Sequence, residues 1–108
     1  MASGDSSHAE GNFTSAIGVD SHSEGYSSIT KGDYAHAEGY SSSAVGAYSH
    51  SEGYKTLALT AGAHAEGKFT QANGEDSHAE GYVSSANGYY SHSEGNATYA
   101  SGYSSGVS

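Results

Sequence analysis

The chain has 108 residues, with twelve acidic and three basic side chains and a formal net charge of −9 when histidine is neutral. Hydrophobic residues make up 34 %, but Ala and Tyr supply most of them, and only eight residues are Leu, Ile or Val. So few large aliphatic side chains exclude an ordinary globular core, and the acidic balance excludes nucleic acid as an expected partner. Cysteine is absent and no apolar run approaches membrane-spanning length, so we expect neither disulfides nor membrane contact by this segment.

Two kinds of chain fit this composition. Low hydrophobicity with high net charge is typical of disorder, whereas a thin core of small side chains is compatible with an elongated repeat fold. The chain has no proline and ten tyrosines, which is unusual for a disordered linker. We therefore favour the repeat fold.

The first candidate element, residues 7–11, reads Ser-His-Ala-Glu-Gly and returns six times with Ser and Ala interchanged. Histidine recurs every 14 residues, with Glu two positions later and Gly three positions later, which is the signature of an internal repeat. The repeated pair consists of His8, His22, His36, His50, His64, His78 and His92 with Glu10, Glu24, Glu38, Glu52, Glu66, Glu80 and Glu94.

The second candidate element, residues 14–18, reads Thr-Ser-Ala-Ile-Gly and also returns every 14 residues. Its glycine falls seven positions after the glycine of the first element, except that Thr60 replaces it once and Gly62 follows two positions later. The glycines that we expect at turns are Gly11, Gly18, Gly25, Gly32, Gly39, Gly46, Gly53, Gly67, Gly74, Gly81, Gly88, Gly95 and Gly102.

Small and variable residues alternate in both elements, and a period of two predicts short strands. The two residues after each glycine read as corners, so a 14-residue coil of two strands and two corners follows. Stacked coils would pair each strand in register with its own equivalent, about 4.8 Å away. The sequence therefore predicts an all-β parallel solenoid, with seven coils over residues 2–102 and a decaying partial coil or tail at 103–108.

The alternation also predicts which side chains face inward. Ala, Ser and Thr are small enough for a narrow interior, whereas burying the His and Glu side chains in an apolar core would be costly. A core of methyl and hydroxyl groups buries little apolar area, so we expect the chain to bury a further surface by self-association. The His/Glu positions keep their residues in every coil, and we predict that this ladder lines the subunit interface.

Ser-His-Ala-Glu-Gly alternating with Thr-x-Ala-x-Gly resembles the head repeats of trimeric autotransporter adhesins, the YadA-like group, over about residues 2–102. Similar repeats occur in phage and prophage fibre proteins. The resemblance implies a left-handed parallel β-roll and a homotrimer. It also implies an extracellular location on a bacterial cell surface, or in a virion fibre.

The residue types of this ladder match two kinds of functional site, a hydrolase triad and a metal site. Ser-His-x-Glu has the residues of a hydrolase triad, but adjacent strand residues point to opposite faces, so we expect no enzyme, no catalytic residue and no cofactor. Neutral imidazole and carboxylate are ligands for zinc or nickel, which leaves an ion site as the alternative to a hydrogen-bonded structural ladder. We adopt the structural ladder. Histidines stacked at strand spacing would repel when charged, so we expect acid to loosen the assembly.

The expected function is that of a structural, adhesive head segment that presents a stiff binding surface. The partners that we expect are copies of the chain itself, with a host surface protein or glycan as the candidate ligand. Tyrosines cluster at the corners, where they can stack on one another or bind sugars and proteins. The alternatives are a phage tail-fibre or appendage segment and a self-assembling repeat scaffold.

Overall fold

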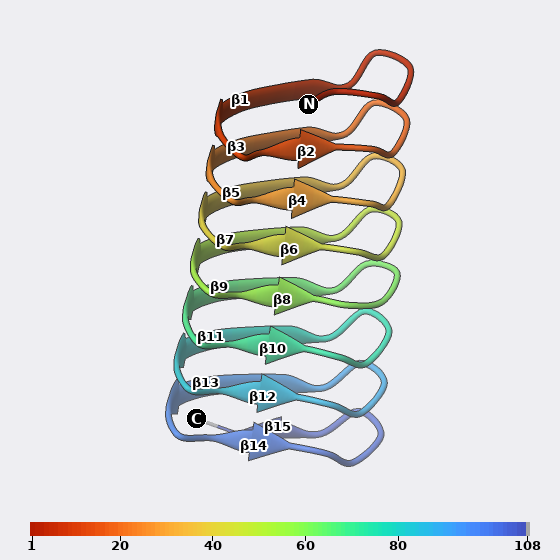
Figure 1. The fold of residues 1–108 in the computed structure, drawn as a ribbon. Helices are drawn as coiled ribbons and strands as arrows, with labels where there is room; N and C mark the ends of the chain where they lie inside the picture. Colours follow the sequence, from red (N-terminus) through yellow and green to blue (C-terminus); the bar gives the residue numbers. More distant parts are fainter. Residues whose placement is uncertain (108) are drawn as a thin grey trace.

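The computed structural model describes residues 1–107 and forms an all-β solenoid in which parallel strands stack coil upon coil (Figure 1). The predicted 14-residue coil is confirmed. No helix in this range is long and apolar enough to cross a membrane. The molecule measures 36 × 20 × 10 Å along its principal axes, so it is a narrow slab with two sheets and almost no depth between them.

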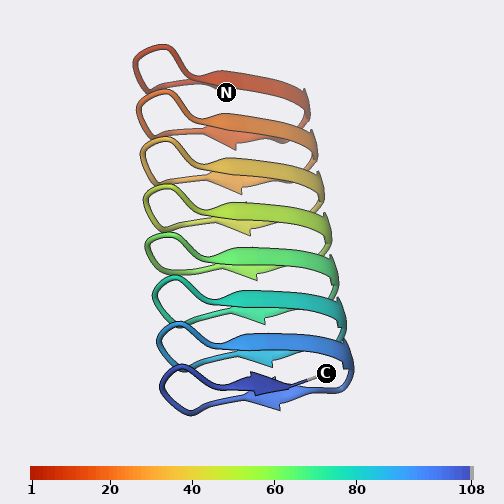
Figure 2. The same cartoon turned by 180° about the vertical axis from the view of Figure 1, so that it is seen from behind.

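Each coil contributes one long and one short strand. The eight-stranded sheet consists of β1 (His8–Asn12), β3 (His22–Tyr26), β5 (His36–Tyr40), β7 (His50–Tyr54), β9 (His64–Lys68), β11 (His78–Tyr82), β13 (His92–Asn96) and β15 (Gly106–Val107). The seven-stranded sheet consists of β2 (Ser15–Ala16), β4 (Ile29–Thr30), β6 (Ser43–Ala44), β8 (Leu57–Ala58), β10 (Gln71–Ala72), β12 (Ser85–Ala86) and β14 (Tyr99–Ala100). Figure 2 shows the long strands from behind, lying side by side along the whole molecule.

The second strand of each coil is shorter than the five residues expected from the alternating pattern. This second strand has only two residues in strand conformation, although the backbone hydrogen bonds between coils extend beyond them. For example, Ile17 N donates to Thr30 O at 2.9 Å. The residues that follow leave the extended conformation to form the loop, which takes up the rest of the expected strand.

The strands pair in the register that the repeat predicts. Every residue of a long strand lies opposite its own equivalent 14 positions later, as His36 opposite His50 and Glu38 opposite Glu52. At the C-terminal end, β15 continues the sheet by pairing Gly106 with His92. The tail expected at 103–108 therefore contributes a strand at Gly106–Val107, and residue 108 lies outside the described residues.

The interior between the two sheets contains only small side chains, as predicted. Ala16, Ala37 and Ala58 are completely buried, and so are several serines and threonines. Most of the buried hydroxyl groups are hydrogen-bonded to the backbone or to one another, which removes most of the cost of burying them. Ser51 Oγ and Thr56 Oγ1, for example, share a hydrogen bond of 2.7 Å.

A left-handed backbone conformation recurs every seven residues, at both corners of each coil. The residues with φ between 53° and 69° are Ser6, Phe13, Asp20, Ser27, Tyr34, Ser41, Tyr48, Lys55, Gly62, Phe69, Asp76, Val83, Tyr90, Ala97 and Ser104. Most of these are residue types that rarely adopt this region. The stacking of the coils imposes the conformation on residues such as Phe13, Tyr34 and Val83, which are not turn residues. Gly62, whose position appeared irregular in the sequence, occupies the same place in its corner.

The repeated glycines have two structural roles. Gly39, with φ of 114°, is the fourth residue of β5, and its equivalents in the other long strands share this conformation. At Gly32, φ is not positive, but an added Cβ would collide with the carbonyl group of Gly46 in the next coil. Close approach of backbone to backbone therefore favours glycine at the Gly32-type positions, where Thr60 is the one exception, and both conformation and approach favour it at the Gly39-type positions.

Gly32→Ala is expected to lower the free energy of unfolding by about 2–3 kcal/mol, because its methyl group overlaps backbone that has no room to move. Gly102→Ala is the matched control, since the nearest atom to its added Cβ is Ser105 Cβ at 3.5 Å. Chemical denaturation at fixed protein concentration measures both. Equal losses at the two positions would contradict a steric origin.

The threonine that replaces alanine in the second coil provides a test of interior polarity. Thr30 Oγ1 is buried without a hydrogen-bond partner, so the isosteric Thr30→Val is expected to stabilise the fold by about 1 kcal/mol. Thr56→Val is the control, because it removes the partner of the buried Ser51 hydroxyl and is expected to destabilise by about 1–3 kcal/mol. Thermal melts of the two variants should shift in opposite directions; a shift in the same direction would refute this assignment.

Candidate functional site

The histidines and glutamates of the repeat project from one face of the sheet of long strands, which we call the His/Glu face. The imidazole rings stack with centroids 4.5–4.9 Å apart along the whole column. In the middle coils the rings are nearly parallel, with His22 and His36 inclined by 1°, whereas the end pairs His8–His22 and His78–His92 are tilted by 41° and 35°. Strand spacing alone sets this separation.

The glutamates stand beside the imidazole column and connect successive coils. Within a coil, the distance from His Nε2 to Glu Oε2 is 3.4–3.7 Å. The second oxygen reaches the next coil: Glu66 Oε1 lies 3.7 Å from His78 Nε2, and Glu80 Oε1 lies 3.9 Å from His92 Nε2. The structure therefore brings all seven His–Glu pairs of the predicted ladder together, and the carboxylates of Glu66 and Glu80 each lie between two imidazoles.

The Nε2 atoms of this column are buried and lack hydrogen-bond partners. In His22, His36, His50, His64, His78 and His92, Nε2 has almost no exposed surface and no partner with hydrogen-bond geometry. The carboxylate oxygens lie near these nitrogens but are not placed to accept from them. Orphaned polar atoms are uncommon in folded proteins and call for a physical explanation.

Burial and mutual repulsion disfavour the charged form of His64, at the middle of the imidazole column. The pKa of His64 is lowered from its ordinary value, first by burial and then by the neighbouring imidazoles of His78 and His50. Glu52 and Glu80 act in the opposite sense but do not overcome these effects. A neutral imidazole has one ring nitrogen free to act as an acceptor or a ligand.

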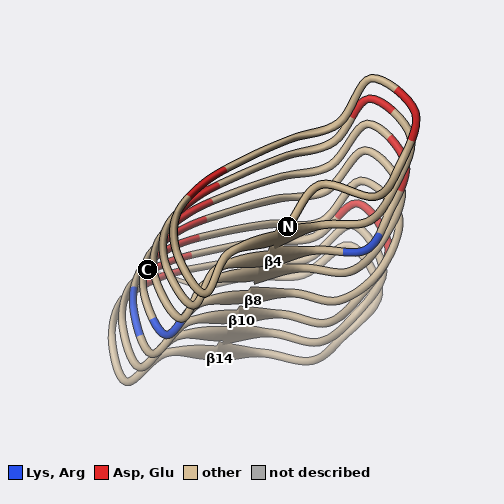
Figure 3. Ribbon diagram, turned by 45° about the horizontal axis from the view of Figure 1, so that its top comes forward, with Lys and Arg blue, Asp and Glu red and all other residues tan. Residues whose placement is uncertain are grey.

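The neighbouring side chains favour the ionised form of Glu66. Hydrogen bonding with the carboxyl groups of Glu80 and Glu52 lowers the pKa of Glu66 from its ordinary value, and the His78 imidazole adds to the effect. The side-chain ion pairs of residues 1–107 all join a histidine to a glutamate, so no lysine neutralises this face. Figure 3 shows the acidic residues recurring at equivalent places in successive coils. With neutral histidines, the face carries a line of uncompensated negative charge.

A groove runs along the His/Glu face through all seven coils. Its lining repeats the glutamate and glycine of each coil, such as Glu38 with Gly39 and Glu52 with Gly53, and it encloses about 1360 Å³. Seven of the glycines that the sequence assigned to turns are the fourth residues of the long strands. These seven form the floor of the groove. Every coil presents the same lining to whatever occupies it.

The serine of the Ser-His-x-Glu motif is separated from the histidine. Ser21 Oγ is buried and donates a hydrogen bond to Gly18 O at 2.7 Å, and Ser77 Oγ donates to Gly74 O at 2.6 Å. These hydroxyl groups thereby fasten the corner to the start of the long strand. They do not meet the imidazole as a nucleophile would meet its base.

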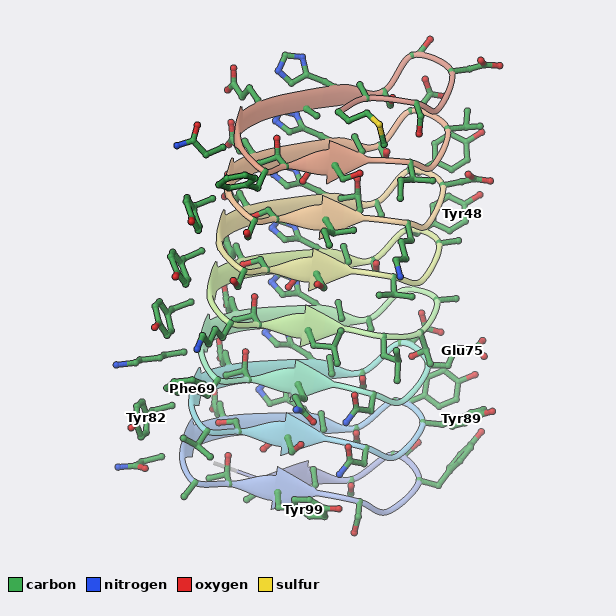
Figure 4. All side chains as sticks on the ribbon, in the orientation of Figure 1. Tyr48, Phe69, Glu75, Tyr82, Tyr89 and Tyr99 are labelled. Atoms are coloured by element: carbon green, nitrogen blue, oxygen red, sulfur yellow. The ribbon has the colours of Figure 1, made fainter. Side chains whose placement is uncertain are left out.

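Two columns of aromatic side chains line opposite edges of the molecule (Figure 4). At the edge that carries Phe69 and Tyr82, the rings of Tyr40 and Tyr54 stack 5.0 Å apart, and Phe69 meets Tyr54 edge to face. At the opposite edge, which carries Tyr48 and Tyr89, Tyr48 stacks on Tyr34 at 5.2 Å. The stacking predicted for the tyrosines is confirmed, and the rings are largely exposed.

Sequence reasoning missed two features of these surfaces. Lys55 and Lys68 lie against the aromatic column, with Lys68 Nζ 5.4 Å from the Tyr54 ring centroid. The repeat spacing was the signal that could have found them, because Lys68 falls 14 residues after Tyr54 and Lys55 falls 14 residues before Phe69. The bridging of successive coils by glutamate was likewise missed, although the invariant His-x-Glu spacing was the signal that could have found it.

No protein-family model matches this chain, and no curated protein matches it. The likeness to adhesin head repeats therefore rests on the repeated residues themselves.

Acid is expected to destabilise the fold, when metal ions are removed with a chelator. Because the pKa of His64 is lowered in the folded chain, the unfolded chain takes up the proton first, and stability falls as pH drops below about 6.5. The lowered pKa of Glu66 extends the loss in the same direction at pH values below about 4.5. Thermal melts from pH 7.5 to 4 measure the effect.

A variant with His50, His64 and His78 changed to Gln provides the control for this pH dependence. It should lose much of the change in melting temperature between pH 7 and pH 5 and keep the change at lower pH. A wild-type melting temperature that is constant from pH 7.5 to 4.5 would show that the column does not oppose protonation.

Proposed function

We propose that this chain is a structural and adhesive segment of a trimeric surface fibre, in which three solenoids pack with their His/Glu faces toward one axis. The observation that carries the proposal is the groove on that face, whose lining is identical in all seven coils. An occupant that fills it along its length must repeat at the spacing of one coil. A second copy of the same chain, aligned in the same axial register, has this repeat.

The thin interior supports association. The two sheets enclose only Ala, Ser and Thr, so a single chain buries little apolar area for its 108 residues. A flat face 36 Å long is available for packing against further copies. Symmetric homo-oligomers are the usual solution for a chain that must bury more surface.

Hydrogen bonding across the axis fits the chemistry of the face. The glutamates of the middle coils are about one-third exposed, so their carboxylates retain open acceptor positions. A neutral imidazole of another copy can donate to them through its second ring nitrogen, because Nε2 is buried within its own chain. This pairing would offset the repulsion between carboxylate columns that meet near the axis.

The winding of the chain supports the left-handed roll that the resemblance implies. In Figure 1 the short strands run from left to right along the front, the long strands return behind them, and successive coils descend. Figure 2 gives the same sense from the other side.

The adhesive part of the proposal rests on the surfaces that remain outside the trimer. The outward residue of the short strands varies along the sheet, with Gln71 and Tyr99 among the exposed ones, and the two edges carry the aromatic columns. Flat apolar rings with hydroxyl groups suit contact with a host protein or a glycan. A fibre of a bacterial cell surface or of a virion would present these surfaces in the same way.

Mass in solution tests the association. Light scattering after size exclusion is expected to give about 33 kDa, three times the 10.9 kDa of one chain. Glu52→Lys with Glu66→Lys places two cations in the middle of the groove in every chain, and we expect it to lower the mass towards that of one chain. Gln71→Lys, on the exposed side of β10, is the matched control and should leave the mass unchanged.

Three outcomes would contradict parts of this proposal. A folded wild-type chain of 10.9 kDa would refute association. Dissociation by Gln71→Lys alone would place the interface on the other sheet. A mass that rises steadily with concentration would favour the self-assembling scaffold over a closed trimer.

A further inference from the structure

The unexplained feature of the His/Glu face is its set of buried imidazole nitrogens without partners. Each pair of adjacent coils brings together two histidines and one glutamate, whose ligand atoms all lie within 4.8 Å of one another. Such groups recur six times along residues 1–107, for example His50–Glu52–His64 and His64–Glu66–His78. Two neutral imidazoles and a carboxylate form a donor set typical of zinc sites.

The distances on this face are close to those of a coordinated ion. Bond lengths of about 2.0–2.2 Å in a tetrahedral zinc site place ligand atoms roughly 3.3–3.5 Å apart. The separations of Glu66 oxygens from His64 Nε2 and His78 Nε2 are 3.6 and 3.7 Å. Only the two rings must tilt toward each other, and the end pair His78–His92 is already tilted by 35°.

We propose that the His/Glu face binds borderline divalent transition-metal ions such as Zn²⁺, each held by Nε2 of two histidines from adjacent coils and by the glutamate between them. The ion supplies the partner that the buried nitrogens lack. It also neutralises negative charge on a face without lysine. A water molecule or a group from outside the chain completes the coordination.

The repeat fixes the number of ions. Each Nε2 has one lone pair and serves one ion, so neighbouring groups that share a histidine cannot both be filled. Ions in adjacent layers would also repel each other at strand spacing. Seven histidines form three pairs with one left over, which gives three ions per chain.

These sites are complete within one chain. All three protein ligands of each site come from a single solenoid, so binding does not require the trimer of the proposed function. The two inferences therefore fail separately: metal content is measured per chain, and mass is measured on the same samples.

Equilibrium dialysis against Zn²⁺ in a non-chelating buffer at pH 7.5, followed by elemental analysis, measures the stoichiometry. The expected result is three zinc ions per wild-type chain. The ¹⁵N NMR signals of the histidine side chains identify the ligand atom, and Nε2 is expected to shift on binding far more than Nδ1. Absence of zinc after dialysis would overturn the proposal, and so would a shift confined to Nδ1.

Two triple variants separate paired sites from independent histidines. Changing His22, His50 and His78 to Gln leaves four histidines, none with a neighbour in the next coil, and is expected to abolish zinc binding. Changing His8, His22 and His36 to Gln also leaves four histidines, but as two adjacent pairs, and is expected to retain two ions.

Equal zinc content in the two triple variants would refute pairing between coils, because both carry the same number of imidazoles. Circular dichroism establishes that each variant is folded. If either fails to fold, changing all six glutamates that lie between histidine pairs to Gln (Glu10, Glu24, Glu38, Glu52, Glu66 and Glu80) provides a second test on the wild-type histidines, with Glu75→Gln at a loop as the control. Reduced zinc content in the first and unchanged content in the second is expected; the reverse would overturn the proposal.

Discussion

The in-register stacking of one 14-residue coil on the next is the constraint on which the rest of this structure depends. It places every side chain directly above its own equivalent, so each residue type is judged by how well it packs against itself. Asn73 and Asn87 satisfy the constraint, since one amide donates to the other at 2.6 Å. The stacked tyrosines of the corners satisfy it through their flat faces.

Stacking also explains why the interior is so small. Parallel coils with short corners hold the two sheets close together, and the buried positions have room only for methyl and hydroxyl groups. Hydroxyl groups such as that of Ser77 add stability by bonding to carbonyl groups of the corners. Because successive coils also approach closely, an added methyl group at Gly32 would collide with the carbonyl group of Gly46. The fold thus derives its order from backbone pairing more than from a hydrophobic core.

Charged residues that are stacked on their equivalents repel each other, and the His/Glu face shows how the chain reduces this repulsion. Alternating two chemistries on one face places an imidazole beside each carboxylate, and glutamates such as Glu66 contact two coils at once. The remedy is incomplete in a single chain, because Nε2 lacks a partner and the glutamate charge is uncompensated. Metal ions would provide a partner for Nε2, and further copies would provide partners for the second ring nitrogen. The two kinds of partner use different atoms of the same side chains. They are therefore compatible with each other on one face.

The sequence by itself determined the coil: its 14-residue length, its parallel register and the inward position of Ala, Ser and Thr follow from a repeat with period-two alternation. It also singled out the histidines and glutamates, because among the side chains of the strands only they kept their identity through seven coils, together with the glycine that follows them. Tertiary structure decided the left-handed backbone conformation at the corners. Residue types as different as Phe13 and Val83 adopt it, and no single residue type marks it. Tertiary structure likewise decided the short second strand and the bridging of coils by Glu66. These features depend on how closely one coil lies on the next, a distance that no single coil contains.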